Sequence, residues 1–336
     1  MTDVEVIMSE FSLSGNYRVQ SRREAEPSKL VGDWFPAAEG LLDADTVNHA
    51  LRAHPFWSRS TNVELRPALV TGRSGKFATE PDILYKRDFF LPDPGTMSMP
   101  VDIVDVRKSR ENWAARAACT KNLLADGTYE RLTERLDDLD VVIANEYYLH
   151  EAGHFLGYDV LTKYQDGYFA PGGKTAWPLV YLEELRADLQ AFGFGARLLP
   201  AAQAARILLY NVALRFGVHR EGLATRGVAP YGIVPFLLFC ILRELRFVSV
   251  ALMNDRWVIR LANLDEFAIV RVMRACAEHA ESELTIPELA TTDVIERALT
   301  AAKYVRRRLA DTDAINDYAR VMGAPSTSEL TDHEQS

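Results

Sequence analysis

Residues 140–154 read Asp-Val-Val-Ile-Ala-Asn-Glu-Tyr-Tyr-Leu-His-Glu-Ala-Gly-His. Apolar residues recur along this stretch without a proline, which predicts a buried helix that stops near Gly157. On a helix, His150 and His154 project from one face about one turn apart. Two imidazoles at that spacing can bind one Zn²⁺, and Glu151 beside them can act as general base for a metal-bound water. The stretch therefore predicts half of a metal site.

A second segment, Trp177–Ala191, supplies the missing ligand. It has helical periodicity and carries Glu184 and Asp188 four residues apart on the same face. Because a catalytic zinc takes three protein ligands and a water, we expect Glu184 to be the third ligand. We expect Asp188 to accept the second N–H of a metal-bound histidine. Glu183 points about 100° away from Glu184 on a helix and is the weaker candidate ligand.

The two segments together resemble the gluzincin metallopeptidases, of which thermolysin is the familiar member. In that group a later helical glutamate is the third zinc ligand, which the resemblance maps onto Glu184. Residues 183–188, Glu-Glu-Leu-Arg-Ala-Asp, are also similar to the E-E-x-R-A-[E/D] signature of the dipeptidyl peptidase III family, whose second glutamate binds zinc. That family has H-E-x-x-G-H, one residue longer than the motif here. The resemblance covers about residues 140–195 and implies the zinc site more strongly than it implies a peptidase.

Composition narrows the class of protein. The chain has 336 residues, 48% of them hydrophobic, and a net charge of −9, so it lacks the basic character typical of a nucleic-acid binder. Its N-terminus has no apolar signal core, and its longest apolar run, Ile233–Leu242, is short enough to predict a buried helix and not a membrane span. Three widely spaced cysteines predict no disulfide framework. We expect a cytoplasmic protein that binds neither nucleic acid nor a membrane, and the oligomeric state stays open.

The remaining pattern predicts an α+β fold, namely a predominantly helical, zincin-like protein with a small N-terminal sheet and a C-terminal β-hairpin. Strands are expected at Val63–Val70, Ile83–Leu91 and Val101–Val106, and the hairpin at Phe247–Leu261. Helices are expected at 111–124, 129–136, 177–198, 201–216, 265–281 and 286–309. The regions are a strand-bearing part (1–110), a helical metal-binding domain (111–310) and a polar tail (311–336), disordered at Ser326–Ser336.

Two segments near the expected site have alternative interpretations. Zincin active sites commonly place a sheet before the metal helix, and its edge strand binds extended substrate. Val101–Val106 is a candidate for that edge strand, and a plain core strand is the alternative. The run Tyr158–Lys174, rich in turn residues and aromatics, joins the two metal-bearing helices. It is either a lid over the site or a simple connection.

The expected mechanism places Zn²⁺ on His150, His154 and Glu184, with Glu151 as general base. A tetrahedral oxyanion needs one more donor besides the metal. The candidates are His219, Arg220 and Tyr231, in or near the loop-like run Gly217–Gly222, and Tyr168 in the connection. Of these His219 is preferred.

Three functions fit this site. The first is a zinc hydrolase acting on a peptide or small amide. The second is a non-peptidase lyase, cyclase or hydrolase acting on a specialised metabolite. The third is a protein with a purely structural metal site, which a fourth protein ligand would indicate.

Overall fold

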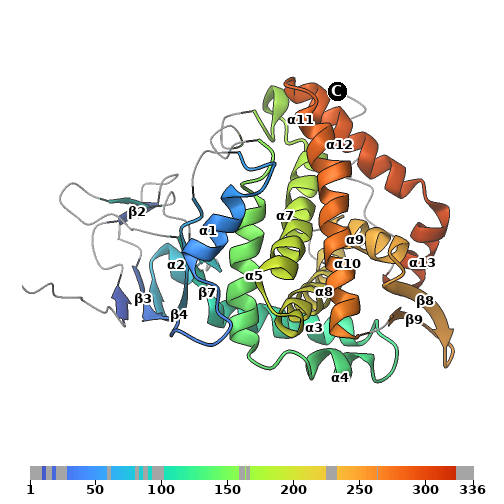
Figure 1. Cartoon of the computed structure of the whole chain (residues 1–336), viewed down its shortest axis with the longest axis horizontal. Helices are drawn as coiled ribbons and strands as arrows, with labels where there is room; N and C mark the ends of the chain where they lie inside the picture. The colour runs from blue at the N-terminus through green and yellow to red at the C-terminus, as the bar shows by residue number, and fades with distance from the viewer. Residues whose placement is uncertain are drawn as a thin grey trace, which may run out of the picture.

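The computed structural model describes residues 10–12, 17–19, 29–58, 62–79, 83–85, 90–92, 102–158, 163, 167–224, 233–262 and 264–322. Within these residues the chain is predominantly helical, with one five-stranded sheet and two two-stranded sheets. Figure 1 shows the N-terminal strands at one side of the helices and the C-terminal hairpin at the other. The α+β, mostly helical class predicted from the sequence is therefore confirmed.

The strands are β1 (Glu10–Ser12), β2 (Tyr17–Val19), β3 (Lys29–Trp34), β4 (Leu65–Ser74), β5 (Leu84–Tyr85), β6 (Phe90–Pro92), β7 (Asp102–Asp105), β8 (Val248–Met253) and β9 (Arg256–Leu261). The first helices are α1 (Ala44–Arg52), α2 (Lys76–Thr79), α3 (Val106–Lys121), α4 (Thr128–Thr133) and α5 (Leu139–Gly153). The 3₁₀ turn η2 (Pro171–Gly173) precedes α7 (Trp177–Leu198), α8 (Ala201–Ala224), α9 (Val234–Glu244) and α10 (Glu266–His279). The π-helix η4 (Ala280–Thr285) leads to α11 (Ile286–Leu289), α12 (Val294–Leu309) and α13 (Thr312–Met322).

The position of β7 decides between the two interpretations of residues 101–106. The large sheet has the order β1-β3-β4-β7-β5, so β7 pairs in parallel with β4 on one side and antiparallel with β5 on the other. The predicted strand Val101–Val106 is therefore a core strand and not a substrate-binding edge. Its Val104 is fully buried and packs in one cluster with Tyr148 and Leu149 of α5. The sheet thus supports the helix that carries both histidines.

Close packing of α3 and α8 explains why one expected loop is wrong. Gly217 was expected to begin a loop-like run, yet α8 continues through it to Ala224. A Cβ on Gly217 would lie 2.1 Å from the carbonyl oxygen of Arg116 on α3. The glycine therefore allows α3 and α8 to approach each other and does not break the helix. His219 lies on α8, and its side chain, like those of Arg220 and Tyr231, falls outside the described residues.

The C-terminal part also differs from its expectation. The expected helix 286–309 is divided, because Asp293 caps a new helix by accepting from the backbone N–H groups of Ile295 and Glu296. The expected polar tail begins with α13, whose Tyr318 is fully buried against Phe236 and Phe239. Ser326–Ser336 lies outside the described residues.

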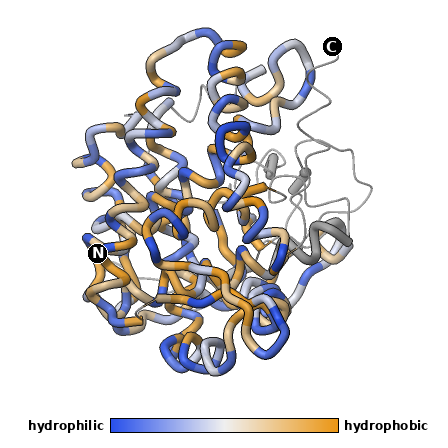
Figure 2. Tube along the Cα trace, turned by 90° about the vertical axis from the view of Figure 1, so that its right-hand side faces the viewer, coloured by the Kyte–Doolittle hydropathy of each residue, from blue (hydrophilic) through white to orange (hydrophobic). Residues whose placement is uncertain are grey.

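Two local predictions are confirmed. Helix α9 matches the apolar run and is buried from Val234 to Leu242. The hairpin β8–β9 turns at Asn254 and Asp255, both at positive φ, as an Asn-Asp turn allows. Figure 2 shows apolar segments concentrated inside the helical part of the molecule. Among the described residues, every helix is too short or too polar to cross a membrane.

Candidate metal centre

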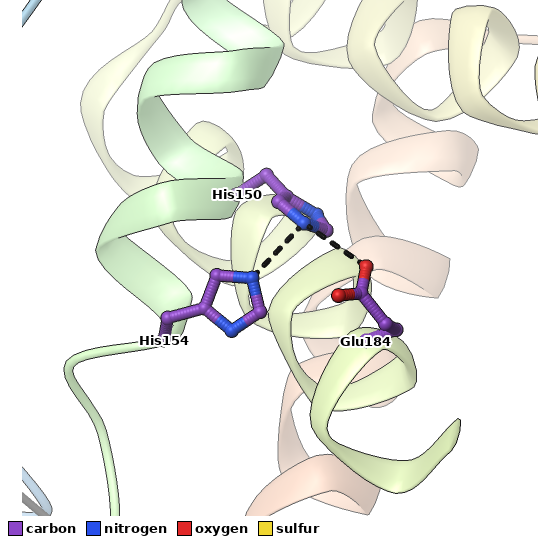
Figure 3. A group of neighbouring side chains, drawn as sticks. All are labelled: His150, His154 and Glu184. Atoms are coloured by element: carbon purple, nitrogen blue, oxygen red, sulfur yellow. Dashed lines mark hydrogen bonds and ion pairs between the residues drawn. The ribbon is translucent and has the colours of Figure 1, made fainter. Parts of the chain in front are cut away.

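The two histidines and Glu184 come together between α5 and α7. His150 lies in the last turn of α5, His154 is the C-cap residue of that helix, and Glu184 projects from α7. One ligand atom from each residue lies within 4.8 Å of the other two. Figure 3 shows the three side chains converging from the two helices. The spacing in the sequence therefore places these residues where one cation would contact all three.

The glycine of the motif makes this convergence possible. A Cβ added to Gly153 would lie 2.8 Å from the Cα and 2.9 Å from the carbonyl oxygen of Ala187 on α7. Such distances are shorter than van der Waals contact, so any side chain would force the helices apart. A glycine at this position allows the two ligand-bearing helices to pack directly on each other.

The two histidine rings face each other through their Nε2 atoms. Nε2 of His154 lies 3.2 Å from Nε2 of His150, and Glu184 Oε2 lies 3.6 Å from that atom of His150. Tetrahedral zinc, with bonds of about 2.0–2.1 Å, separates neighbouring ligand atoms by roughly 3.3–3.4 Å. The two observed separations lie close to this value. Two of the three separations between ligand atoms therefore match a tetrahedral cation, and the third lies within 4.8 Å.

Glu184 supplies an acceptor that lacks a hydrogen bond. Its Oε2 is buried and has no hydrogen-bond partner among the described residues. Burial raises the pKa of Glu184, but its interactions with the imidazoles of His150 and His154 outweigh this and hold the pKa well below its ordinary value. Glu184 is thus a partly buried carboxylate whose buried oxygen, Oε2, is directed at His150. A metal ion would satisfy that oxygen.

Asp188 holds the ring of His150. His150 Nδ1 lies 2.9 Å from Asp188 Oδ1, and Asp188 is fully buried. Arg215 on α8 clamps the same carboxylate through two N–H donors, at 2.7 Å to Oδ2 and 2.6 Å to Oδ1. Burial raises the pKa of Asp188, but Arg215 and His150 lower it below the ordinary value. An ionised Asp188 only accepts, so Nδ1 of His150 donates and its Nε2 lone pair is directed at the metal position.

Glu183 holds the ring of His154, a role that the sequence interpretation did not assign. His154 Nδ1 lies 2.9 Å from Glu183 Oε1. The same oxygen accepts from Lys163 Nζ at 2.8 Å, and Arg186 donates to Oε2. Glu183 is therefore not in the ligand group, as its 100° offset from Glu184 indicated, but orients a ligand. The signal in the sequence was the first acid of the E-E-x-R-A-D string, which precedes the ligand Glu184.

Lys163 also fixes the end of the metal helix. Its ammonium donates to the carbonyl oxygens of His154 at 2.7 Å and Leu156 at 3.1 Å. These carbonyls follow the last turn of α5, where no further helical N–H reaches them. One buried lysine therefore binds both the backbone of a ligand residue and the carboxylate that orients its ring.

Glu146 forms a deeper layer behind His150. It is buried one turn before His150 on α5, and its Oε1 accepts from Asn211, which also donates to Asp188 at 3.2 Å. Burial raises the pKa of Glu146, which favours its neutral form. Glu146, His150 and Asp188 are close enough to be a second ligand group. Because Arg215 already occupies Asp188, this group supports the ring of His150 and is not a second metal site.

The other predicted catalytic residues have different outcomes. Glu151 follows His150 on α5 and is partly exposed, and it does not belong to the ligand group. The hydroxyl of Tyr168 donates to Glu288 on α11 and the ring is buried. Burial and that carboxylate raise the pKa of Tyr168. The hydroxyl of Tyr168 is therefore bound to α11 and is not directed at the metal ligands. His219 cannot be placed, since its side chain is outside the described residues.

Comparison with known proteins adds no relative. No protein-family model matches the chain, and a search of curated proteins found no significant match. The geometry itself defines a class of site, in which two imidazoles and one carboxylate converge and each imidazole has its own carboxylate partner.

Proposed function

We propose that the protein is a zinc-dependent hydrolase with a gluzincin-type centre formed by His150, His154 and Glu184. The observation that carries this proposal is the convergence of two Nε2 lone pairs and the unpartnered Glu184 Oε2 on one point. Two Nε2 lone pairs 3.2 Å apart repel each other, and either a proton on one ring or a metal cation between the rings removes that repulsion. When bound there, zinc would lower the pKa of a water and polarise a substrate carbonyl.

The other residues of the site have two roles, orientation of the ligands and proton transfer. Asp188 and Glu183 fix both rings in the tautomer that presents Nε2, so the ligands need no reorientation. Glu151, adjacent to His150 and partly exposed, is the proposed general base that takes the proton of the water and returns it to the leaving group. The amine that leaves when an amide is cleaved needs that proton, because a deprotonated amine is a poor leaving group.

The number of ligands favours a catalytic site over a structural one. A structural zinc is almost always held by four protein ligands, whereas a catalytic one keeps a position for water. Within the described part of the chain, the ligand group has three members. This is the count that a hydrolytic centre requires.

A second candidate is a non-peptidase metalloenzyme acting on a small specialised metabolite, with the same residues. The sheet favours it, because β7 is enclosed between β4 and β5 and offers no free edge to an extended peptide. The described edge strand on that side, β5, is only two residues long. A small amide is therefore a better substrate candidate than a long peptide.

Metal analysis and a substrate screen test the proposal together. We expect one zinc per wild-type chain and a loss of zinc in His154→Ala. Peptides and small acyl amides should be cleaved by the wild type and not by Glu151→Gln, which keeps the metal. Absence of stoichiometric metal in the wild type would refute the centre, and unchanged turnover in Glu151→Gln would refute the role of Glu151.

A further inference from the structure

A cavity of about 250 Å³ lies on the side of α7 that faces α12. Leu179, Leu182 and Arg186 of α7 line it. At about 100° per residue, these positions are on roughly the opposite face of the helix from Glu184 and Asp188. The cavity is therefore separate from the three proposed ligands, although Glu183, which orients His154, also lines it.

Arg297 is the unusual residue of this cavity. It lies in the first turns of α12 and is only 6% exposed. Its guanidinium carbon lies 4.2 Å from the ring centre of Tyr158 and 4.6 Å from that of Tyr168. Its Nε and Nη1 are buried and have no hydrogen-bond partner among the described residues. Aromatic rings attract the cation but cannot satisfy both in-plane N–H groups.

The acids that line the cavity already have cationic partners. Glu183 is bound by Arg186 and Lys163, and Glu288 is bound by Arg186 and the Tyr168 hydroxyl. The third acid, Glu283, pairs with Arg307 in a more exposed position. Arg297 is therefore left without a counter-ion in the described part of the cavity, and Lys303 adds a further positive charge to the lining.

The remaining walls are apolar. Leu179, Leu284, Pro287 and Ala301 contribute aliphatic surface beside the guanidinium. A buried charge without a partner is costly, and a guanidinium fork binds carboxylate and phosphate groups through two parallel hydrogen bonds. The volume lies below the roughly 300–1,000 Å³ typical of drug-sized pockets, so the ligand would be small.

We propose that this cavity is a second binding site, for a small organic anion whose carboxylate or phosphate group pairs with Arg297. The apolar walls contact the aliphatic part of the ligand, and Lys303 strengthens the attraction for negative charge. This site goes beyond the proposed hydrolytic function and does not depend on it.

Calorimetric titration of the zinc-loaded protein with succinate, and separately with inorganic phosphate, at constant ionic strength tests the proposal. We expect saturable binding of at least one anion at one site per chain, and the tighter of the two identifies the preferred headgroup. Arg297→Gln should weaken binding by about tenfold or more, and Arg297→Lys by less, since it keeps the charge but loses the fork. The matched control is Arg320→Gln, whose guanidinium stacks on Trp257 outside the cavity and should leave affinity unchanged.

Two further variants keep the result interpretable. Thr300→Phe leaves Arg297 in place but fills the cavity that Thr300 lines, so it should also abolish binding even if Arg297→Gln is poorly folded. Glu184→Gln weakens the metal centre and should leave anion affinity unchanged. The proposal is overturned if neither anion binds saturably, if Thr300→Phe binds like the wild type, or if affinity disappears with Glu184→Gln, which would place the anion at the metal.

Discussion

His154 Nε2 lies 3.2 Å from His150 Nε2, although the two residues are held by different carboxylates of α7. His150 meets Asp188, and His154 meets Glu183, so the later residue on α5 contacts the earlier residue on α7. The helices therefore run antiparallel past each other, and the register sets both histidine tautomers at once.

Glu183→Gln tests whether orientation of His154 matters for the metal. The variant keeps all three ligands but removes the negative charge that polarises the Nδ1–H of His154. Loss of such a partner typically costs about 10–100-fold in metal affinity. Competition with a chelator of known affinity measures the zinc affinity of the variant. Glu283→Gln, a change of the same type at an exposed acid paired with Arg307, should leave affinity unchanged. Equal affinities in the two variants would contradict the role of Glu183.

Arg215→Gln should unfold the protein more easily. Arg215 and Asp188 form a bidentate pair in which both side chains are buried. Removing one partner of such a pair costs about 3–5 kcal/mol, because the other charge stays buried and uncompensated. Arg110→Gln removes a similar pair with Asp140, but Arg110 is 53% exposed, so the expected cost is below about 1 kcal/mol. Urea unfolding of both variants measures the difference, and equal free energies of unfolding would show that Asp188 is stabilised otherwise.

The site residues that the sequence predicts are those separated by one helical turn along the chain. His150, His154, Glu184 and Asp188 each follow from a four-residue step on one helix, and the structure has those helices almost where periodicity placed them. Trp177–Leu198 was predicted with the bounds that α7 has. Such features depend on 3.6-residue periodicity and on the absence of breakers, which the sequence displays directly.

The supporting residues could not be predicted because their contacts are not local. Arg215, Asn211 and Lys163 reach the site from α8 and from the connection, and only the tertiary register brings them there. Gly217 illustrates the same limit, because a glycine can either end a helix or admit a close neighbour, and only the position of α3 decides between the two.

His279 should make stability depend on pH. Burial, followed by the nearby charge of Arg308, lowers the pKa of His279 to about 4, and its Nε2 lies 2.8 Å from the Tyr304 hydroxyl. Below about pH 6.5 the unfolded chain binds a proton that the folded chain refuses. The stabilisation is therefore complete above pH 6.5 and is lost as the pH falls toward 4.

The expected loss from His279 is about 3 kcal/mol at most between pH 7 and pH 4. Unfolding free energies measured across this range should fall less steeply for His279→Gln than for the wild type. His49→Gln, at an exposed position on α1, is the control for removing a histidine. Parallel pH profiles for wild type and His279→Gln would show that His279 is not the group responsible.

Gly153→Ala should damage the metal centre although neither a ligand nor a partner is changed. In an open helix this substitution stabilises by about 1 kcal/mol, since alanine is the better helix former. Here the new Cβ would lie 2.8 Å from the Cα of Ala187. Because this neighbour is a backbone atom, it cannot move aside by a side-chain rotation. The helices must separate by a fraction of an ångström or more, which pulls Glu184 away from the histidines.

We therefore expect Gly153→Ala to lower both the melting temperature and the zinc content, measured by calorimetry and metal analysis on the same sample. Gly195→Ala is the matched control, because Gly195 is also a helical glycine, on α7, but the nearest atom to its new Cβ would be the flexible end of Met273 at 3.3 Å, with Leu149 and Ile207 at ordinary contact distance. That side chain can move aside, so the control should retain its zinc. If Gly153→Ala bound zinc with wild-type affinity, the close approach of α5 and α7 would not be what holds the three ligands together.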